Sequence, residues 1–262
     1  MKEFGIDISR HNGNFDLERA VREGVRFVIL KGGGGDDGLY TDARFAKNYE
    51  KCKALGLPVG VYWFSRALSE ADAKKEAEYF YENCLMGRQF ELPVYIDVEN
   101  AAMIKIGKRR LTDTVRTWCD TLEDKGFFVG IYSSTYYFRA YMYDAELQAY
   151  THWVAQWNSE CTYPYPDVLG VWQFGGETNL IRSNKVAGKI CDQDYLYTDF
   201  PYRIEKAGLN GFGRQPEKTI REVAEEVIRG DWGNGDERKL RLKAAGYDPK
   251  AVQQEVNRIL YG

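Results

Sequence analysis

The sequence predicts an irregular (β/α) barrel followed by a small three-helix unit. Short β-branched and aromatic runs alternate with helical patterns over the first half of the chain. That alternation is typical of a parallel sheet with right-handed crossovers. After Tyr132, strand patterns continue with no room for full helices between them. Beyond residue 207 the alternation stops and three short capped helical patterns follow.

Five strands and the helices between them account for the first half. The strands are expected at residues 4–9, 27–31, 58–64, 94–99 and 127–132. Helices are expected at residues 17–21, 43–55, 70–84 and 112–125. Asp16, Asp42 and Ser69 stand at helix starts, where a short side-chain oxygen can accept free backbone N–H groups. Gly24, Gly56 and Gly126 follow helix ends, as C-terminal caps do.

The second half of the barrel is expected to be short of helices. One helix is predicted near residues 136–143, and strands are predicted at 152–157, 170–174 and 190–195. Eight strands with about five helices indicate a closed but irregular barrel, which we assign to residues 1–206.

The sequence of the C-terminal region predicts a linker and a separate small domain. Residues 207–217 are rich in glycine, include Pro216 and lack periodicity, so they are expected to form a linker. Residues 218–262 contain a capping box at Thr219 to Glu222, and Asp236 and Asp248 are expected to cap two further helices. A unit of this size has little core, and such modules usually bind rather than catalyse.

Composition excludes several classes of function. A net charge of −3 gives no support for binding nucleic acid or an anionic membrane surface. No apolar run approaches the ~18 residues that a membrane span needs. The five cysteines lack metal-binding spacing and indicate reduced core residues, and two histidines argue against a His-based metal site. We therefore expect no metal, no cofactor, no signal peptide and synthesis in a reducing cytoplasm; oligomeric state is not predicted.

The strand at residues 94–99 carries two acids, Asp97 and Glu99. Side chains alternate along a strand, so both point the same way, roughly 6–7 Å apart. Crowded, poorly solvated acids raise each other's pKa, which suits a general acid beside an ionised partner. The structural alternative is a capping Asp with a solvated Glu.

Other polar and aromatic residues are expected at the same end of the barrel, where catalytic groups gather in this architecture. They are Asp7, Ser9, Tyr62, Phe64, Tyr132, Gln156, Trp157, Gln173, Asp192 and Asp194. Acids flanked by aromatic rings predict a carbohydrate-cleaving cleft. The glycine run at residues 32–35 lacks a nucleotide-binding pattern, and we interpret it as a flexible rim.

Residues 3 to about 200 resemble the family 25 glycoside hydrolases, the Chalaropsis-type lysozymes found in many phage endolysins. The segments that carry the resemblance are GIDIS (5–9), FVILK (27–31), GLPVGVY (56–62), YIDVE (95–99), GIY (130–132), WQF (172–174) and CDQD (191–194). Residues 219–260 resemble the type 7 cell-wall-binding repeat, on GDWGNGDER (230–238) and AGYD (245–248).

The first resemblance implies a (β/α)5(β)3 barrel that hydrolyses the β-1,4 bond between N-acetylmuramic acid and N-acetylglucosamine. It implies that Glu99 is the general acid and that Asp97 stabilises the reacting sugar, directly or by orienting its 2-acetamido group. Asp7 and Asp192 would line the cleft, with Asp192 favoured over Asp194 in the alignment of CDQD. The residues expected to bind substrate are Tyr62, Phe64, Tyr132, Trp157, Gln173 and Asp194.

Two departures from the family bear on cleft shape. Trp63 stands where relatives often carry a histidine, and glycines 32–35 replace an acidic glycine turn.

The second resemblance implies binding to the peptidoglycan of Gram-positive bacteria. The candidate wall-binding residues are Trp232, Asp236, Arg238 and Arg241. The surrounding basic cluster is expected either to hold an anionic muropeptide or to be a solvated basic face. An enzyme of this type is expected to be made in the host cytoplasm and to act on the wall after release.

Three alternatives remain open. One is another acetamido-sugar glycosidase such as a chitinase, distinguished by its products. The second is a non-catalytic wall-binding protein on a decayed barrel, distinguished by binding without cleavage. The third is a metal-dependent hydrolase built on the four acids, which activity in the presence of a chelator would exclude.

Overall fold

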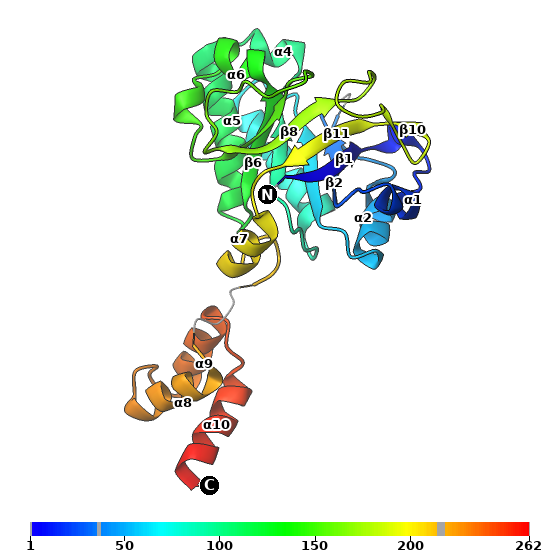
Figure 1. Ribbon diagram of the computed structural model, residues 1–262. Coiled ribbons are helices and arrows are strands. Elements are labelled where there is room, and N and C mark those ends of the chain that lie inside the picture. Colours follow the sequence, from blue (N-terminus) through cyan, green and yellow to red (C-terminus); the bar gives the residue numbers. More distant parts are fainter. Residues whose placement is uncertain (1, 36–37, 214–217, 262) are drawn as a thin grey trace.

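The computed structural model describes residues 2–35, 38–213 and 218–261, and within them the predicted barrel is present (Figure 1). Its sheet has the strand order β1-β11-β8-β7-β6-β5-β4-β2-β3, and β1 also pairs with β2, which closes the barrel. The eight barrel strands are β1 (Glu3–Ile8), β2 (Phe27–Gly34), β4 (Val59–Phe64), β5 (Val94–Asp97), β6 (Val129–Ser134), β7 (Thr151–Ala155), β8 (Leu169–Gly175) and β11 (Asp192–Leu196). The short strand β3 (Tyr40–Thr41) pairs antiparallel with the end of β2.

Helices cover the outside of the barrel. They are α1 (Leu17–Arg22), α2 (Phe45–Ala54), α3 (Glu70–Phe80), α4 (Ala101–Ile104), α5 (Lys108–Glu123) and α6 (Thr135–Tyr141), with single turns η1 (Arg10–Asn12), η2 (Tyr81–Leu85) and η3 (Asp144–Glu146). The predicted caps Asp16 and Ser69 accept the N–H groups of Arg19 and Asp72. No helix in the described part of the chain is long and apolar enough to span a membrane.

Two hydrophobic cores hold the barrel together. One fills its interior and includes Phe27, Tyr95 and Trp153. The other lies between the strands and the helices and includes Trp63 and Trp118. Because side chains alternate along each strand, the polar residues that share the interior face are directed into the barrel.

The last strand corrects the expectation of a parallel sheet. β11 runs antiparallel to both β1 and β8, with Asp192 opposite Asp7. The chain returns from β8 through a hairpin of β9 (Lys185–Val186) and β10 (Lys189–Ile190) rather than a crossover helix. A connection of this kind permits antiparallel pairing. Asp192 therefore reaches the cleft from the start of the strand, not from its end.

The predicted linker at residues 207–217 is wrong for its first part. Helix α7 (Phe200–Ala207) places Phe200 and Ile204 in the interior core at the strand starts. After it, Asn210 is fully buried, and its amide Nδ2 donates to the carbonyls of Phe90 (3.0 Å) and Leu92 (2.9 Å). These bonds satisfy carbonyls at the base of the barrel, so this segment is part of it. Residues 214–217 lie outside the described residues.

The C-terminal unit consists of α8 (Ile220–Arg229), α9 (Gly235–Ala244) and α10 (Pro249–Tyr261) around its own core. Thr219 and Glu222 form the predicted capping box, and Asp248 accepts the N–H of Lys250. The expectation for Asp236 is wrong. The N-cap position of α9 is Asn234, and Asp236 lies in the first turn, where it pairs with Lys239.

Candidate active site

An acidic cavity of about 240 Å³ lies at the mouth of the barrel. Its wall consists of Asp7, Tyr62, Asp97, Glu99, Tyr132, Trp153, Trp157, Gln173, Glu177 and Asp192. The cavity thus brings together all four predicted catalytic acids and four of the six predicted substrate-binding residues. The two others, Phe64 and Asp194, are not part of its wall.

The two acids of the central strand occupy different environments. Asp97 is the last residue of β5 and is buried, and its Oδ1 has no hydrogen-bond partner among the described residues. Glu99 lies two residues further on and is exposed at the rim. Asp97 therefore offers an unpaired acceptor from the floor of the cavity, while Glu99 reaches it from the edge.

Gln173 connects three walls of the cavity. Its Oε1 accepts hydrogen bonds from the hydroxyl of Tyr132 (2.9 Å) and the indole N–H of Trp157 (3.2 Å). Its Nε2 donates to Oδ2 of Asp7 (2.9 Å). Because each contact fits only one orientation of the amide, the chain fixes how Asp7 and Trp157 face the cavity.

Burial and mutual repulsion raise the pKa values of the acids. Burial raises the pKa of Asp97 well above its usual value, and the neighbouring Glu99 raises it further. Burial also raises the pKa of Glu99, because surrounding protein limits its hydration even at the rim. The ammonium group of Lys31 opposes both shifts. A Glu held partly protonated next to a second acid is suited to donate a proton.

Asp192 and Asp194 are separated by the antiparallel strand that carries them. Asp192 lines the cavity, where burial and the charges of Glu99 and Glu177 raise its pKa to about 6. Asp194 is fully buried below it, and its Oδ1 accepts the indole N–H of Trp153 (2.8 Å). Burial raises its pKa well above the usual value. Of the two acids, Asp192 therefore lies on the cavity wall, and Asp194 lies beneath it.

Three residues near the acids were missed in the sequence. Trp153 and Glu177 line the cavity, and Lys31 lies beside it, with its Nζ 4.6 Å from the ring centroid of Phe64. Lys31 shares the inward face of its strand with Ile29, so strand alternation could have identified it. Phe64 lies against this lysine rather than on the wall.

Within the described residues, no group of three or more His, Cys, Asp or Glu side chains is arranged to hold a metal ion.

The glycine run is not the flexible rim that was expected. Residues 32–34 belong to β2 and are buried. A Cβ on Gly33 would collide with the carbonyl of Tyr40 and lie 2.7 Å from the ring of Trp63. A Cβ on Gly35 would lie 2.7 Å from the carboxylate of Glu76, which accepts the indole N–H of Trp63 (3.0 Å). The glycines therefore make room for Trp63 and its partner.

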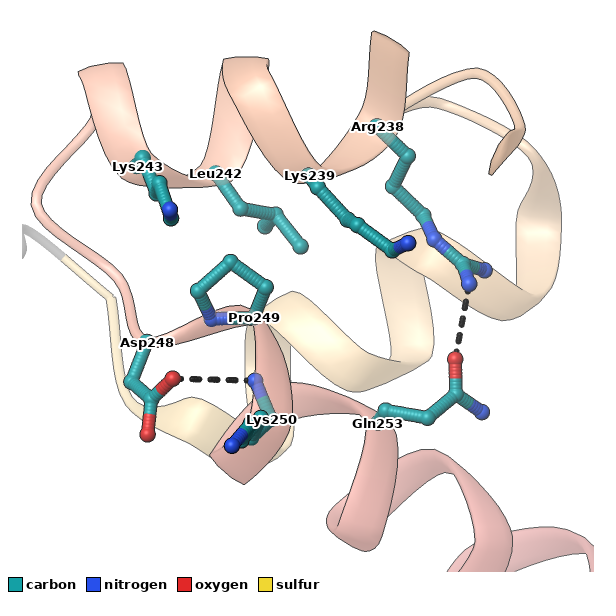
Figure 2. Close-up of a pocket in the computed structure, with 8 residues that line it drawn as sticks. All are labelled: Arg238, Lys239, Leu242, Lys243, Asp248, Pro249, Lys250 and Gln253. Atoms are coloured by element: carbon teal, nitrogen blue, oxygen red, sulfur yellow. Dashed lines mark hydrogen bonds between the residues drawn. The ribbon is translucent and has the colours of Figure 1, made fainter. Parts of the chain in front are cut away.

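The C-terminal unit has a cavity of its own, of about 600 Å³, between α9 and α10 (Figure 2). It is lined by Arg238, Lys239, Leu242, Lys243, Asp248, Pro249, Lys250 and Gln253. Four of these side chains are cations, and Nη2 of Arg238 donates to Oε1 of Gln253 at 2.7 Å. Leu242 and Pro249 form an apolar patch between them in Figure 2.

Of the four predicted wall-binding residues, Arg238 alone lines this cavity. The indole of Trp232 donates to Glu226 (3.0 Å) and packs against Tyr247 in the helical core. Asp236 pairs with Lys239, and Arg241 pairs with Glu237. Those contacts indicate structural or solvated positions for these three side chains.

Two segments of the chain match known protein families. Residues 6–181 match glycosyl hydrolases family 25, and residues 221–260 match the CW_7 repeat. The lysozyme of Streptococcus phage Cp-7 is 28% identical over 261 residues, which is 97% of this chain and 69% of that protein. The autolytic lysozyme of Clostridium acetobutylicum is 32% identical over 138 residues, which is 52% of this chain and 39% of that protein.

Among solved structures, the modular autolysin LytC from Streptococcus pneumoniae, in complex with a synthetic peptidoglycan ligand, has the same fold, with a TM-score of 0.64 and 23% identity. The alignment covers 75% of this chain and 47% of LytC. The chain thus spans less than half the length of this structure and of the clostridial relative.

Proposed function

The chain belongs to glycosyl hydrolase family 25, and we propose that it is a lysozyme of the endolysin type. On this proposal it hydrolyses the β-1,4 bond between N-acetylmuramic acid and N-acetylglucosamine in peptidoglycan, and its C-terminal repeat holds it at the wall. The observation that carries the proposal is the convergence of Asp7, Asp97, Glu99 and Asp192 in one cavity with aromatic walls.

Glu99 acts as the general acid in this proposal. Its raised pKa keeps part of the population protonated where a free glutamate would be ionised, and its place at the rim leaves it open to the glycosidic oxygen. Protonation of that oxygen lets the leaving sugar depart without carrying a negative charge.

Asp97 orients the 2-acetamido group of the reacting sugar. A buried carboxylate oxygen without a partner needs a donor, and the acetamido N–H supplies one. Held in this way, the acetamido carbonyl can approach the anomeric carbon as positive charge develops there. Asp7 and Gln173 hold the substrate from the other side, and Trp157 stacks against a sugar ring.

The cavity between α9 and α10 is proposed to bind an anionic part of a muropeptide. Support comes from Arg238, Lys239, Lys243 and Lys250 around an apolar patch, which fits a carboxylate next to short aliphatic side chains. We propose the wall of Gram-positive bacteria as the target, because relatives of this chain include an autolytic lysozyme of Clostridium acetobutylicum and a lysozyme of a Streptococcus phage.

Two glutamates of the same cavity provide a matched test. Glu99→Gln and Glu177→Gln each remove one carboxylate from the wall, but only the first removes the proposed acid. Initial rates on purified Gram-positive walls should fall about 10²–10⁴-fold for Glu99→Gln and stay within a few-fold for Glu177→Gln. Near-native hydrolysis by folded Glu99→Gln would overturn the assignment.

The same assay distinguishes this proposal from the alternative functions. Turnover of chitin at a rate comparable with cell walls would favour the wider class of acetamido-sugar glycosidases. Retention on walls without release of any fragment by the wild-type chain would favour a non-catalytic wall-binding protein.

A further inference from the structure

A second barrel cavity lies at the end opposite the acidic cleft. Its volume is about 440 Å³. Residues 86–89 line it before β5 begins, and Lys125 and Phe127 line it before β6 begins. Gly211, in the buried segment after α7, completes the wall. The cavity therefore opens at the N-terminal ends of the strands, and the proposed hydrolysis does not use it.

Two cations, Arg88 and Lys125, line this cavity. Arg88 uses Nη1 for one bond to the carbonyl of Cys84 (3.1 Å) and lies 5.6 Å from the ring of Tyr49. Lys125 is exposed, and its Nζ lies 4.5 Å from the ring of Tyr81. In the part of the chain that the structure describes, neither cation has a carboxylate within salt-bridge distance. The cavity thus presents two positive charges beside aromatic rings.

The walls that carry these groups are tightly held. The hydroxyl of Tyr49 bonds to both the N–H and the carbonyl of Gln89, each at 3.0 Å. Nε2 of Gln89 donates to the carbonyl of Gly211 (3.2 Å). Gly211 has a φ of +85°, and a Cβ there would collide with the carbonyl of Arg88. Because the wall is already ordered, a ligand would lose little free energy to arranging it.

We propose that this cavity binds a phosphate ester. Arg88 and Lys125 contact the phosphate oxygens, while Tyr81 and Phe127 lie against the attached sugar or polyol. The planar fork of a guanidinium matches phosphate geometry, and a second cation adds to the attraction for the anion. The volume exceeds that of a free phosphate ion and leaves room for the esterified group.

Nuclear magnetic resonance of the full-length, ¹⁵N-labelled chain tests this proposal. Glycerol 3-phosphate added at constant ionic strength should produce saturable shifts confined to the amides of residues 86–89, 125–127 and 211. Lys125→Gln should weaken binding at least tenfold, and this exposed position should tolerate the change. Lys105→Gln removes the same charge from an exposed lysine outside the cavity and should leave binding unchanged.

The binding result for each comparison ligand has a defined interpretation. A phosphodiester such as glycerophosphoglycerol that binds more tightly than the monoester would identify a polymer-derived ligand, and the reverse order would identify a free metabolite; both support the proposal. Equal binding of acetate, or of inorganic phosphate without the ester, would overturn it. Shifts spread over the surface, or binding unaffected by Lys125→Gln, would also overturn it. None of these readouts depends on hydrolysis at the cleft.

Discussion

The acids of the cleft differ in chemistry because of what surrounds each one. Asp97 is buried with an unpaired oxygen, Glu99 is at the rim, and Asp7 is tied to Gln173. Lys31 is a cation that faces this group and lowers the pKa of both Asp97 and Glu99. It therefore opposes the effect of burial and narrows the pH range in which Glu99 keeps its proton.

Lys31→Gln should move the alkaline limb of the pH–activity profile to higher pH. Without the ammonium group, ionised Glu99 loses a favourable neighbour, so its pKa rises and its acid form persists further. The measurement is kcat/KM against pH on a soluble muropeptide polymer, with Lys75→Gln on the exposed face of α3 as the control. An unchanged limb, or a shift to lower pH, would refute the role of Lys31.

Asp192→Asn should stabilise the fold at neutral pH but not at pH 4. The folded protein raises the pKa of Asp192 from 3.8 to about 6, so native stability falls as pH rises through that interval and the buried group ionises. Asparagine removes this cost, which a shift of this size puts at about 1–3 kcal/mol. Thermal unfolding at both pH values measures it. The exposed Asp167→Asn should show no such pH-dependent gain; an equal gain for Asp192→Asn at pH 4 and pH 7 would contradict the account.

Among the elements, the strands that carry the acids could be predicted and the direction of the last could not. The apolar run identified the strand at residues 94–99, which in the structure ends at Asp97, and the strand ends also predicted that Asp7 and Gln173 lie at the same mouth of the barrel. Periodicity says nothing about strand direction, so the antiparallel β11 and the separation of Asp192 from Asp194 required the three-dimensional pairing. Trp153 was missed because an apolar strand residue looks the same whether it fills the core or lines the cleft.

The glycine run shows how one large residue, Trp63, restricts the residue types that a neighbouring strand can carry. Gly33 packs against the ring of Trp63 from β4 and the carbonyl of Tyr40 from β3, and both neighbours lie outside the glycine run. Local sequence alone indicated flexibility there, because nothing in the run itself reveals which neighbour occupies the space.

Gly33→Ala should destabilise the barrel by about 1–3 kcal/mol, as overpacking of a tight core does. Gly175→Ala is the matched control, since its Cβ would meet nothing nearer than the carbonyl of Thr178 at 3.8 Å. Denaturant unfolding of both variants gives the comparison. Equal stabilities would show that Trp63 can move aside, and the tight fit would then not be the reason for glycine.

For the whole molecule, the boundary between the barrel and the repeat comes later than composition indicated. Glycine content marked residues 207–217 as a linker, but composition cannot reveal that Asn210 closes the base of the barrel through backbone carbonyls. The helical unit has its own hydrophobic core, and the sequence predicted its capping box at Thr219 and Glu222 and the cap at Asp248.

Two truncations test this boundary. A chain that ends at Gly213 keeps the bonds of Asn210 and should retain the thermal stability of the barrel and its hydrolysis of soluble fragments, while losing most association with walls. A chain that ends at Ala207 loses those bonds and should unfold at a lower temperature. Equal stability of the two would place the boundary before Asn210, and full wall association without the repeat would refute its targeting role.

The central claim is cleavage of a muramic acid linkage by the four-acid cleft. Mass spectrometry of the fragments released from purified Gram-positive walls tests it most directly, with Glu99→Gln treated in parallel. We predict fragments with N-acetylmuramic acid at the reducing end, absent from the variant. Reducing-end N-acetylglucosamine, or the same fragments released by Glu99→Gln, would contradict the claim.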